Sequence, residues 1–368
     1  MNEFIPISRP SITKLEIEYV NEAVTSGWVS SLGKFVDLFE TGFAEFCGAE
    51  YAVSTCNGTA AIHLALQAYG IGAGDEVIVP DLSFIATANA VVHASATPVF
   101  ADVDAETLCL SPESVQACIT PQTKAIMPVH LYGHPAEMDK LMAIAVQNNL
   151  IVIEDAAEAH GSTFRGKKVG CLGHCGTFSF YGNKNMTTGE GGAIVTNDAD
   201  FAKRCKMLRD HAMDHEKRYW HYELGFNYRL TNIQAALGYA QLQRADELLG
   251  RRTKIFERYH ARLADIEGLS LNRTRSHCTN SYWIVCAEID GIDANRRELI
   301  MASLKQRNVD SRPYFYPMSD MPYFEVADTP VSHDVYQRGI NLPTFFDLKD
   351  DQIDIVASAL RETINDLA

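Results

Sequence analysis

One lysine of this sequence lies where a side-chain amine could do covalent chemistry. Lys184 is part of a polar, glycine-rich loop, residues 181–191, that follows the apolar run at residues 176–180. Glycines in such a loop let the backbone turn sharply beside a ligand. A lysine near a bound carbonyl compound can form an imine with it when the surroundings lower the pKa of its ammonium group. Most lysines are solvated surface charges, so the location of Lys184, and not its residue type, makes it a candidate.

A carboxylate in another segment suits the same chemistry. The apolar run at residues 150–155 ends in Glu154 and Asp155. A carboxylate at the carboxyl end of a strand can accept a hydrogen bond from a protonated pyridine nitrogen, which keeps such a ring cationic and able to accept electrons. For this segment alone, an N-cap of the following helix is an equally good interpretation.

Two further segments place polar residues at the starts of helices. Asn57, Gly58 and Thr59 begin a stretch with helical periodicity. Free backbone N–H groups and the positive end of the helix form an anion site there, and glycine lets a phosphate approach the backbone. A simple N-cap is the more common role of such residues. Asn227 and Arg229 come just before another helical stretch.

The elements that must position these residues alternate in type. Between about residues 50 and 200, short apolar runs alternate with stretches of helical spacing. Strand, helix and strand in succession imply a mostly parallel sheet with helices on both faces, and such a sheet binds ligands at the carboxyl ends of its strands. The expected strands are residues 77–80, 97–103, 124–132, 150–155 and 176–180, and the expected helices are residues 59–69, 84–94 and 138–148.

One connection departs from this pattern. Residues 192–197 resemble a strand, and they follow residues 176–180 across the glycine-rich loop without an intervening helix. A parallel crossover normally needs a helix. We therefore expect residues 192–197 to form an antiparallel strand in an otherwise parallel sheet.

The remainder of the chain is typical of a smaller α+β domain. A chain of 368 residues is long enough for one large and one small domain. We divide it into residues 1–245, an N-terminal segment with the large domain, and residues 246–368, the small C-terminal domain. Across this boundary and beyond, the pattern predicts one long helix at residues 230–267, a strand at 281–288, and helices at 294–306 and 350–366.

The composition bounds the class of protein. Hydrophobic residues make up 46% and charged residues 21% of the chain, as in ordinary globular proteins. The net charge of −15 argues against a surface for nucleic acid. The start of the chain lacks a basic segment followed by an apolar run, and no apolar run is long enough to span a bilayer. Nine scattered cysteines suit reduced thiols. We expect a cytoplasmic protein with no membrane partner.

Two groups of potential metal ligands lack the spacing of a metal site. His130 and His134 lie at the end of an expected strand and in the following turn, where an i, i+4 pair does not share one face as it does on a helix. Cys171 and Cys175, with two histidines nearby, match no usual structural zinc site. We therefore expect no bound metal.

The order and spacing of these segments resemble one enzyme family. FSFYGNK and TTGEGG around Lys184, DAAEAHG from Asp155 onward, and NYRLTNIQAA from Asn227 onward resemble the sugar aminotransferases of the DegT type. The resemblance runs from ISRPSIT near the start to RGINLPTF near the end, through SGWVSSLGKFV, VHLYGHP and SRPYFYP. It implies the aspartate-aminotransferase fold (fold type I), pyridoxal 5'-phosphate (PLP) as cofactor, a homodimer, and a place in amino-sugar and polysaccharide biosynthesis.

The resemblance also implies roles for individual residues. Lys184 would form the imine with PLP and, once released, move the proton, while Asp155 would pair with the pyridine nitrogen. Glu158, where relatives often carry glutamine, would lie near the ring hydroxyl, and Phe84 would stack on the ring face. The phosphate would be held by Gly58, Thr59 and Ser179, and by Asn227 of the partner subunit. Candidates for contacts with the substrate are Ser31, Trp220, Arg229 and Tyr316, although Trp220 fits a core position equally well.

The reaction implied by the resemblance is transfer of an amino group from glutamate to C4 of a nucleotide-linked 4-keto-6-deoxyhexose. The main alternative keeps the chemistry and changes the acceptor to a 3-keto sugar, an aminocyclitol precursor or a sugar-acid aldehyde, because fold and cofactor do not fix the substrate. A relative with histidine in place of the loop lysine performs a dehydration, and the presence of Lys184 argues against that reaction. A non-catalytic regulator with this fold is a further alternative, which the complete set of residues for imine chemistry disfavours.

One difference from the family concerns the substrate. Many relatives carry a histidine shortly after the proline of a C-terminal tyrosine–proline motif, whereas here Tyr316 and Pro317 are followed by Met318 and Ser319. In the family that region lies near the sugar. The difference therefore bears on which sugar is used and not on the cofactor chemistry.

Overall fold

Short runs rich in β-branched residues form a seven-stranded sheet in the computed structural model, which describes residues 3–214 and 216–367. The strand order is β1-β9-β8-β5-β4-β2-β3, as the resemblance to fold type I implies for a mostly parallel α/β sheet. The strands are β1 (Tyr51–Thr55), β2 (Glu76–Pro80), β3 (Thr97–Ala101), β4 (Thr123–Ile126), β5 (Ile151–Asp155), β8 (Cys175–Ser179) and β9 (Gly192–Thr196).

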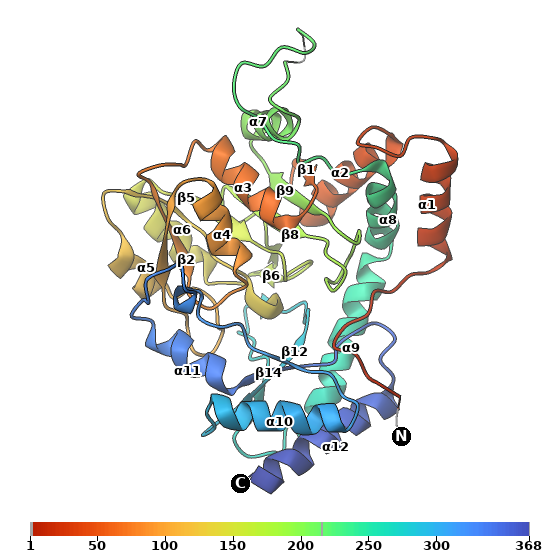
Figure 1. Ribbon diagram of the computed structural model, residues 1–368, viewed down its shortest axis with the longest axis vertical. Helices are drawn as coiled ribbons and strands as arrows, with labels where there is room; N and C mark the ends of the chain where they lie inside the picture. The colour runs from red at the N-terminus through yellow and green to blue at the C-terminus, as the bar shows by residue number, and fades with distance from the viewer. Residues whose placement is uncertain (1–2, 215, 368) are drawn as a thin grey trace.

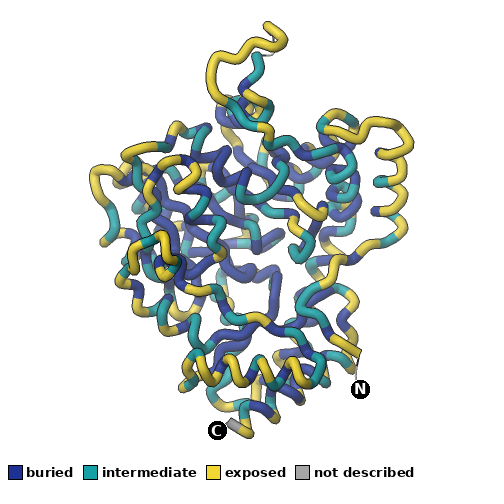
Figure 2. Tube along the Cα trace, in the orientation of Figure 1, coloured by how far each residue is buried: buried dark blue, intermediate teal, exposed yellow. Residues whose placement is uncertain are grey.

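Helices bury their apolar faces on both sides of this sheet (Figure 1). One face shares a core with α3 (Gly58–Ala68), α4 (Ala86–His93) and α7 (Ala199–Arg209). The other face packs against α5 (Pro112–Cys118) and α6 (Met138–Asn148). A third core forms where the end of the sheet meets α1 (Lys14–Thr25), α2 (Lys34–Cys47) and α8 (Asn232–Gln243). The buried positions run through the centre of the molecule in Figure 2.

The prediction of one antiparallel strand is confirmed. β9 pairs antiparallel with both β8 and β1, whereas β2, β3, β4, β5 and β8 pair in parallel. Because β8 and β9 are neighbours running in opposite directions, the loop between them returns the chain at the carboxyl end of β8. That loop carries Lys184 to the edge of the sheet where parallel strands present their ligands.

Three expected elements differ from the structure, and the first is the strand expected at residues 281–288, which begins only at Val285. The strand expected at residues 124–132 ends at Ile126, shortly before Pro128, which lacks the N–H group that a ladder needs. The long helix expected at residues 230–267 is two helices, α8 and α9 (Ala245–Leu263), with Arg244 between them at φ −109° and ψ 13°. Arg244 bridges the buried Glu16 and the exposed Glu247, an arrangement that helical periodicity does not encode.

The C-terminal part of the chain builds a second, antiparallel sheet in the order β10-β12-β14-β13. Its elements, after α9, are β10 (Leu269–Leu271), β12 (Val285–Ile289), α10 (Ala294–Gln306), β13 (Arg312–Pro313), α11 (Pro330–Arg338), β14 (Gly339–Leu342) and α12 (Asp350–Leu367). A small third sheet joins β11 (Cys278–Thr279) to β6 (Thr163–Phe164) and β7 (Lys167–Lys168), and two 3₁₀ turns are η1 (Leu131–Gly133) and η2 (Met318–Asp320).

We propose that the boundary between the two domains lies at residue 245, where α8 ends and α9 begins. α8 packs against α1 and α2, while α9 packs against α12 (Figure 1). The first residues of the chain cross this boundary, because Ile5 bridges Val309 and is buried in the C-terminal core.

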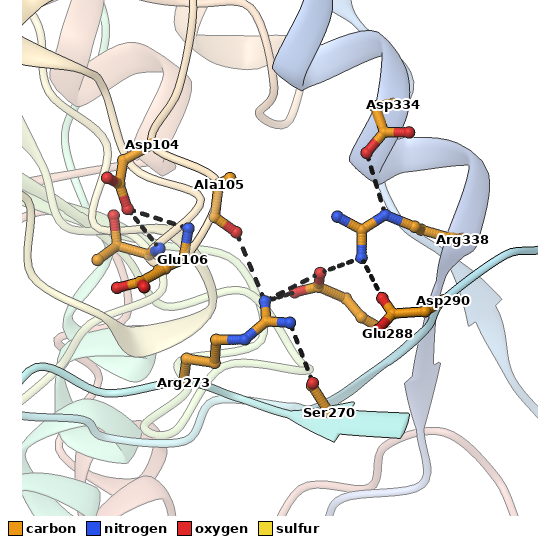
Figure 3. Close-up of polar contacts among 10 residues, drawn as sticks. Asp104, Ala105, Glu106, Ser270, Arg273, Glu288, Asp290, Asp334 and Arg338 are labelled. Atoms are coloured by element: carbon orange, nitrogen blue, oxygen red, sulfur yellow. Dashed lines mark hydrogen bonds and ion pairs between the residues drawn. The ribbon is translucent and has the colours of Figure 1, made fainter. Parts of the chain in front are cut away.

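An ion-pair network fastens the C-terminal part to the loop that follows β3 (Figure 3). The buried carboxylate of Glu288 on β12 accepts hydrogen bonds from Arg273 at 3.1 Å and from Arg338, at the end of α11, at 2.9 Å. Arg273 also reaches the carbonyl of Ala105 in the loop after β3. The network stabilises the relative position of the two sheets, and hence the shape of the cavities between them. No helix in the described part of the chain is long and apolar enough to cross a membrane.

Candidate active site

A cavity of about 630 Å³ lies at the carboxyl ends of β5 and β8 and the start of α3. We call it the cofactor cavity. It brings together the residues that the family resemblance assigns to the ring and the phosphate of PLP: Gly58, Thr59, Phe84, Asp155, Glu158, Ser179 and Lys184.

Lys184 extends from the β8–β9 loop into this cavity. The loop is held by a hydrogen bond from the Lys184 N–H to the carbonyl of Tyr181. The side chain is 11% exposed, and its Nζ lies 3.4 Å from Oε1 of Glu158. The same nitrogen lies 4.0 Å from the ring centroid of Trp283, within the range of a cation–π contact. The amine is therefore confined between a carboxylate and an aromatic face.

Asp155 ends β5 with its carboxylate buried. Oδ2 accepts a hydrogen bond from Thr87 Oγ1 at 2.8 Å, and Oδ1 accepts one from the Ala157 N–H at 3.1 Å. Burial raises the pKa of Asp155, while these two hydrogen bonds and the charge of Lys184 oppose the rise. Neither hydrogen-bond partner carries a positive charge, so a cationic nitrogen brought into the cavity would favour the ionised carboxylate.

Glu158, three residues further on, is a second buried carboxylate of the cavity. Its Oε2 accepts a hydrogen bond from the Tyr132 N–H at 3.0 Å, and its Oε1 faces Lys184. Burial raises the pKa of Glu158, and the charge of Lys184 works in the other direction. Glu158 can therefore hold the lysine amine or hydrogen-bond a hydroxyl group in the cavity.

The first turn of α3 forms the anion-binding end of the cavity. The side chain of Asn57 is the N-cap and accepts the Ala60 N–H at 2.8 Å, which leaves the N–H groups of Gly58 and Thr59 for an anion. A Cβ atom added to Gly58 would lie 2.8 Å from Cβ of Ser179. Glycine is therefore the residue that lets the start of α3 and the end of β8 come together around a small ligand.

Phe84 provides the aromatic surface of the cavity. Its side chain is 54% exposed although it lines the cavity, and its ring lies 5.8 Å from that of Phe315. An exposed aromatic face inside a cavity is suited to stacking on a planar ring. The donors, carboxylates and aromatic ring described above thus fit the phosphate, ring nitrogen, hydroxyl and ring face of PLP.

Five of the predicted site residues do not line this cavity in the described chain. Asn227 accepts hydrogen bonds from Arg229, which also pairs with Asp210. Trp220 is 46% exposed in the segment between α7 and α8, which projects from the rest of the molecule (Figure 1). Ser31 lies in the connection between α1 and α2. The assignments of Ser31, Trp220 and Arg229 to the substrate stay predictions, and that of Asn227 to the phosphate is a prediction that depends on a second subunit.

Tyr316 lines a second cavity of about 460 Å³, which we call the acceptor cavity. Its side chain is half exposed there. The two cavities adjoin one another, because both are lined by Ser83, Phe84, Asn183, Trp283 and Phe315. A molecule held in the acceptor cavity can therefore reach into the cofactor cavity.

Sequence reasoning missed several residues that shape the site. Thr87 lies one helical turn after Phe84, and that i, i+3 spacing was a usable signal. Trp283 lies two residues before β12 and far from Lys184 in sequence. His63 on α3 contacts the Tyr228 hydroxyl at 3.0 Å, and both line the cofactor cavity. His63 lies one helical turn after Thr59 on α3, which was a signal of the same kind, whereas no local pattern marks Trp283 as a site residue.

The chain is similar to known proteins over its whole length. Residues 10–361 match the DegT/DnrJ/EryC1/StrS aminotransferase family. GDP-perosamine synthase of Caulobacter vibrioides is 45% identical and covers 98% of each chain, and that of Escherichia coli O157:H7 is 42% identical over 99% of this chain and 100% of its own. A Streptococcus pneumoniae protein, named as a sugar aminotransferase and solved in a PLP form, superposes with a TM-score of 0.95 at 26% identity and covers 100% of both chains.

These matches agree with the geometry of the cofactor cavity. The family match spans both sheets, and a Lys, an Asp and a helix N-terminus meet in one cavity as PLP requires. The chain belongs to the DegT/DnrJ/EryC1/StrS aminotransferase family and is a PLP-dependent sugar aminotransferase.

Proposed function

We propose that this enzyme moves an amino group from glutamate to C4 of a nucleotide-linked 4-keto-6-deoxyhexose, in the manner of a GDP-perosamine synthase. The convergence of Lys184, Asp155 and Glu158 in one cavity supports the chemistry. The acceptor is supported by two relatives named GDP-perosamine synthase, which are 45% and 42% identical along nearly the whole chain. A 3-keto sugar, an aminocyclitol precursor or a sugar-acid aldehyde is the alternative acceptor.

The proposed mechanism assigns each buried group one task. PLP, when bound, supplies the electron sink for the bond broken at the donor carbon. Asp155 would hold the ring nitrogen in its protonated form, and Gly58, Thr59 and Ser179 would hold the phosphate. Lys184 would bind the cofactor covalently and, once displaced by the amino donor, carry the proton on Nζ. Glu158 lies 3.4 Å from that nitrogen and would keep the free amine in the cavity.

Turnover on a panel of acceptors tests this proposal. The purified protein, supplied with PLP and glutamate, is incubated with a GDP-linked 4-keto-6-deoxyhexose, its dTDP- and UDP-linked counterparts, and a nucleotide-linked 3-keto sugar. We expect 2-oxoglutarate to form fastest with the GDP-linked compound, and mass spectrometry to show an amine in place of the ketone. Faster turnover of the 3-keto sugar, or of an acceptor without a nucleotide, would replace the proposed substrate with that class.

We also propose that the active enzyme is a homodimer whose two sites each use Asn227 of the partner subunit. α1 and the segment after it present exposed apolar side chains, Ile17, Val24, Trp28, Val29 and Leu32, which a second copy would cover. Within the described chain, Asn227 is held by Arg229 and lies outside the cofactor cavity. A donor that completes the phosphate site from a second subunit is consistent with a two-fold interface.

Mixing two inactive variants tests the shared site. Lys184→Ala removes the amine, and Asn227→Asp places a negative charge against the phosphate; the second variant is first shown to be inactive by itself. In a heterodimer one site carries both defects and the other carries neither. Activity should return to at most about a quarter of wild type if subunits pair at random. No recovery, despite exchange demonstrated with a tagged subunit, would mean that each site is built within one chain.

A further inference from the structure

The wall of the acceptor cavity depends on a stretch of chain with little regular structure. Residues 314–329 connect β13 to α11, and their only regular structure is the short 3₁₀ turn η2 and an isolated bridge from Pro317 to Leu82. This stretch, which we call the acceptor wall, gives the cavity Phe315, Tyr316, Met318 and Met321. Without a ladder or a helix of its own, its position must be set by contacts with other elements.

One buried residue, Asp81, makes four of these contacts. Asp81 directly follows β2 and is completely buried. Its Oδ1 accepts the Ser319 N–H at 2.7 Å, and its Oδ2 accepts the hydroxyl groups of Ser319 at 2.8 Å and Thr329 at 2.5 Å. Its carbonyl oxygen accepts the Met318 N–H at 2.7 Å. Asp81 thus holds the acceptor wall at its middle and at its end.

The partners of the Asp81 carboxylate are neutral donors, so hydrogen bonds alone stabilise its buried charge. A buried carboxylate that is not ion-paired must be satisfied by hydrogen bonds, and each missing bond leaves a desolvated charge. The acceptor wall can therefore not move away from Asp81 without a large loss of stability. A histidine adds a second fastening, because His333 contacts Thr329 Oγ1 at 3.0 Å and Asp320 Oδ1 at 3.2 Å.

We propose that Asp81 is a specificity-determining positioning residue: it fixes the acceptor wall, and through Tyr316 and Met318 it sets the space in which the keto-sugar is held. The inference rests on the proposed function, because it takes the acceptor cavity to be the place of the sugar. Asp81 lines neither cavity, so its effect passes through the residues it holds. In this chain Met318 and Ser319, which follow the tyrosine–proline motif, are both hydrogen-bonded to Asp81.

A neighbouring aspartate offers a matched control. Asp102 directly follows β3, the strand beside β2. Its carboxylate accepts the N–H groups of Val331 and Ser332 at 2.9 and 2.8 Å, at the start of α11. Like Asp81, it joins a strand end of the large sheet to the C-terminal chain. It differs in holding a regular helix beyond the acceptor wall, so its loss should leave the cavity unchanged.

The test compares Asp81→Ala, Asp81→Asn and Asp102→Ala in the PLP-loaded enzyme. The KM of each acceptor that wild type uses is measured beside the KM of glutamate in the donor half of the reaction. We expect Asp81→Ala to raise the acceptor KM by about ten-fold or more. Loss of the hydrogen bonds to the charged carboxylate should lower the population of the ordered acceptor wall by at least about that factor, and only the ordered wall binds the acceptor. The glutamate KM should stay within about two-fold. Asp81→Asn should rescue most of the loss, because the two hydroxyl groups can turn to accept from its amide.

A second measurement follows the wall itself. Hydrogen exchange of peptides that cover residues 314–329 should become faster in Asp81→Ala and remain as in wild type in Asp102→Ala. If Asp81→Ala does not fold, Ser319→Ala, which removes one of the donors, takes its place with the same direction of change.

Three results would overturn the inference. They are an unchanged acceptor KM in folded Asp81→Ala, an equal rise in the glutamate KM, and an acceptor wall that exchanges as slowly as in wild type. These outcomes differ from a failure of the proposed function, which would appear in the wild-type enzyme as preference for another class of acceptor. The KM comparison is then made with that acceptor, and the exchange measurement needs no sugar.

Discussion

Replacing Asp155 by asparagine separates the charge of the carboxylate from its shape. In the folded chain the amide can still accept the Ala157 N–H through its oxygen, while its NH₂ group faces Thr87, whose hydroxyl can turn to accept. Burial raises the pKa of Asp155, so the uncharged amide also removes a buried charge that is costly to ionise. We therefore expect the free energy of unfolding to change by no more than about 1 kcal/mol, measured by urea denaturation without PLP.

The effect on the reaction should be much larger. A charge-assisted hydrogen bond contributes roughly 1.5–3 kcal/mol, which corresponds to a factor of about 10 to 150. Loss of the electron sink adds to this factor in turnover, whereas PLP keeps its phosphate contacts and its bond to Lys184. The Kd of PLP should therefore rise by at most the same factor of about 10 to 150, and turnover at saturating PLP should fall further, by more than about 100-fold, because the electron sink is weakened as well.

Glu158→Gln is the matched control for this experiment. It removes one negative charge from an equally buried position in the same cavity, and its amide can still accept from the Tyr132 N–H. The assay is release of 2-oxoglutarate from glutamate, with PLP binding followed by fluorescence. Equal losses in the two variants would show that only the total charge of the cavity matters. Near-normal turnover in Asp155→Asn would show that another group pairs with the ring.

Three further perturbations test other parts of the site and the fold. Lys184→Ala should fold normally and lose turnover. Borohydride reduction of the PLP-loaded wild type should attach the cofactor to Lys184, as shown by peptide mass mapping, and labelling of a different lysine would refute the assignment. Gly58→Ala should weaken PLP binding by about ten-fold or more because its Cβ meets the end of β8, whereas Gly250→Ala, with open space around it, should bind PLP as wild type does. Glu40→Gln should lower the free energy of unfolding by about 3–5 kcal/mol because it leaves the mostly buried Arg209 without its anion; a change below about 1 kcal/mol would show that the pair contributes little. Burial opposes ionisation of Glu40, yet Arg209 and Lys206 lower its pKa. The melting temperature of wild type should therefore exceed that of Glu40→Gln above about pH 4.5. This difference should disappear as the pH falls through the lowered pKa of Glu40.

The candidate site could largely be predicted from the sequence because its residues follow local signals. Asp155 ends an apolar run, Lys184 follows one, and Gly58 opens a helix. In a parallel sheet all three positions lie at one edge, whatever the order of the strands. The topology thus brings them together without any knowledge of particular long-range contacts.

Elements whose boundaries depend on distant partners were predicted less well. β1 (Tyr51–Thr55) was not expected, since it is short and lacks a long apolar run, and its pairing with β9 forms the edge of the sheet. The break between α8 and α9 at Arg244 depends on the buried carboxylate of Glu16, more than two hundred residues away. Periodicity shows that α9 is amphipathic, but not that it packs on a different core from α8.

What the sequence by itself determined is the cofactor chemistry: a lysine, a carboxylate and a helix start at the carboxyl edge of a parallel sheet, in the order and spacing of one enzyme family. Only the tertiary structure decided what surrounds them. It placed Trp283, just before β12, against Lys184, and it joined Asp81, just after β2, to the acceptor wall by hydrogen bonds. The physical reason is that backbone periodicity depends on neighbours in the chain, whereas the packing of a side chain depends on whichever distant element covers it.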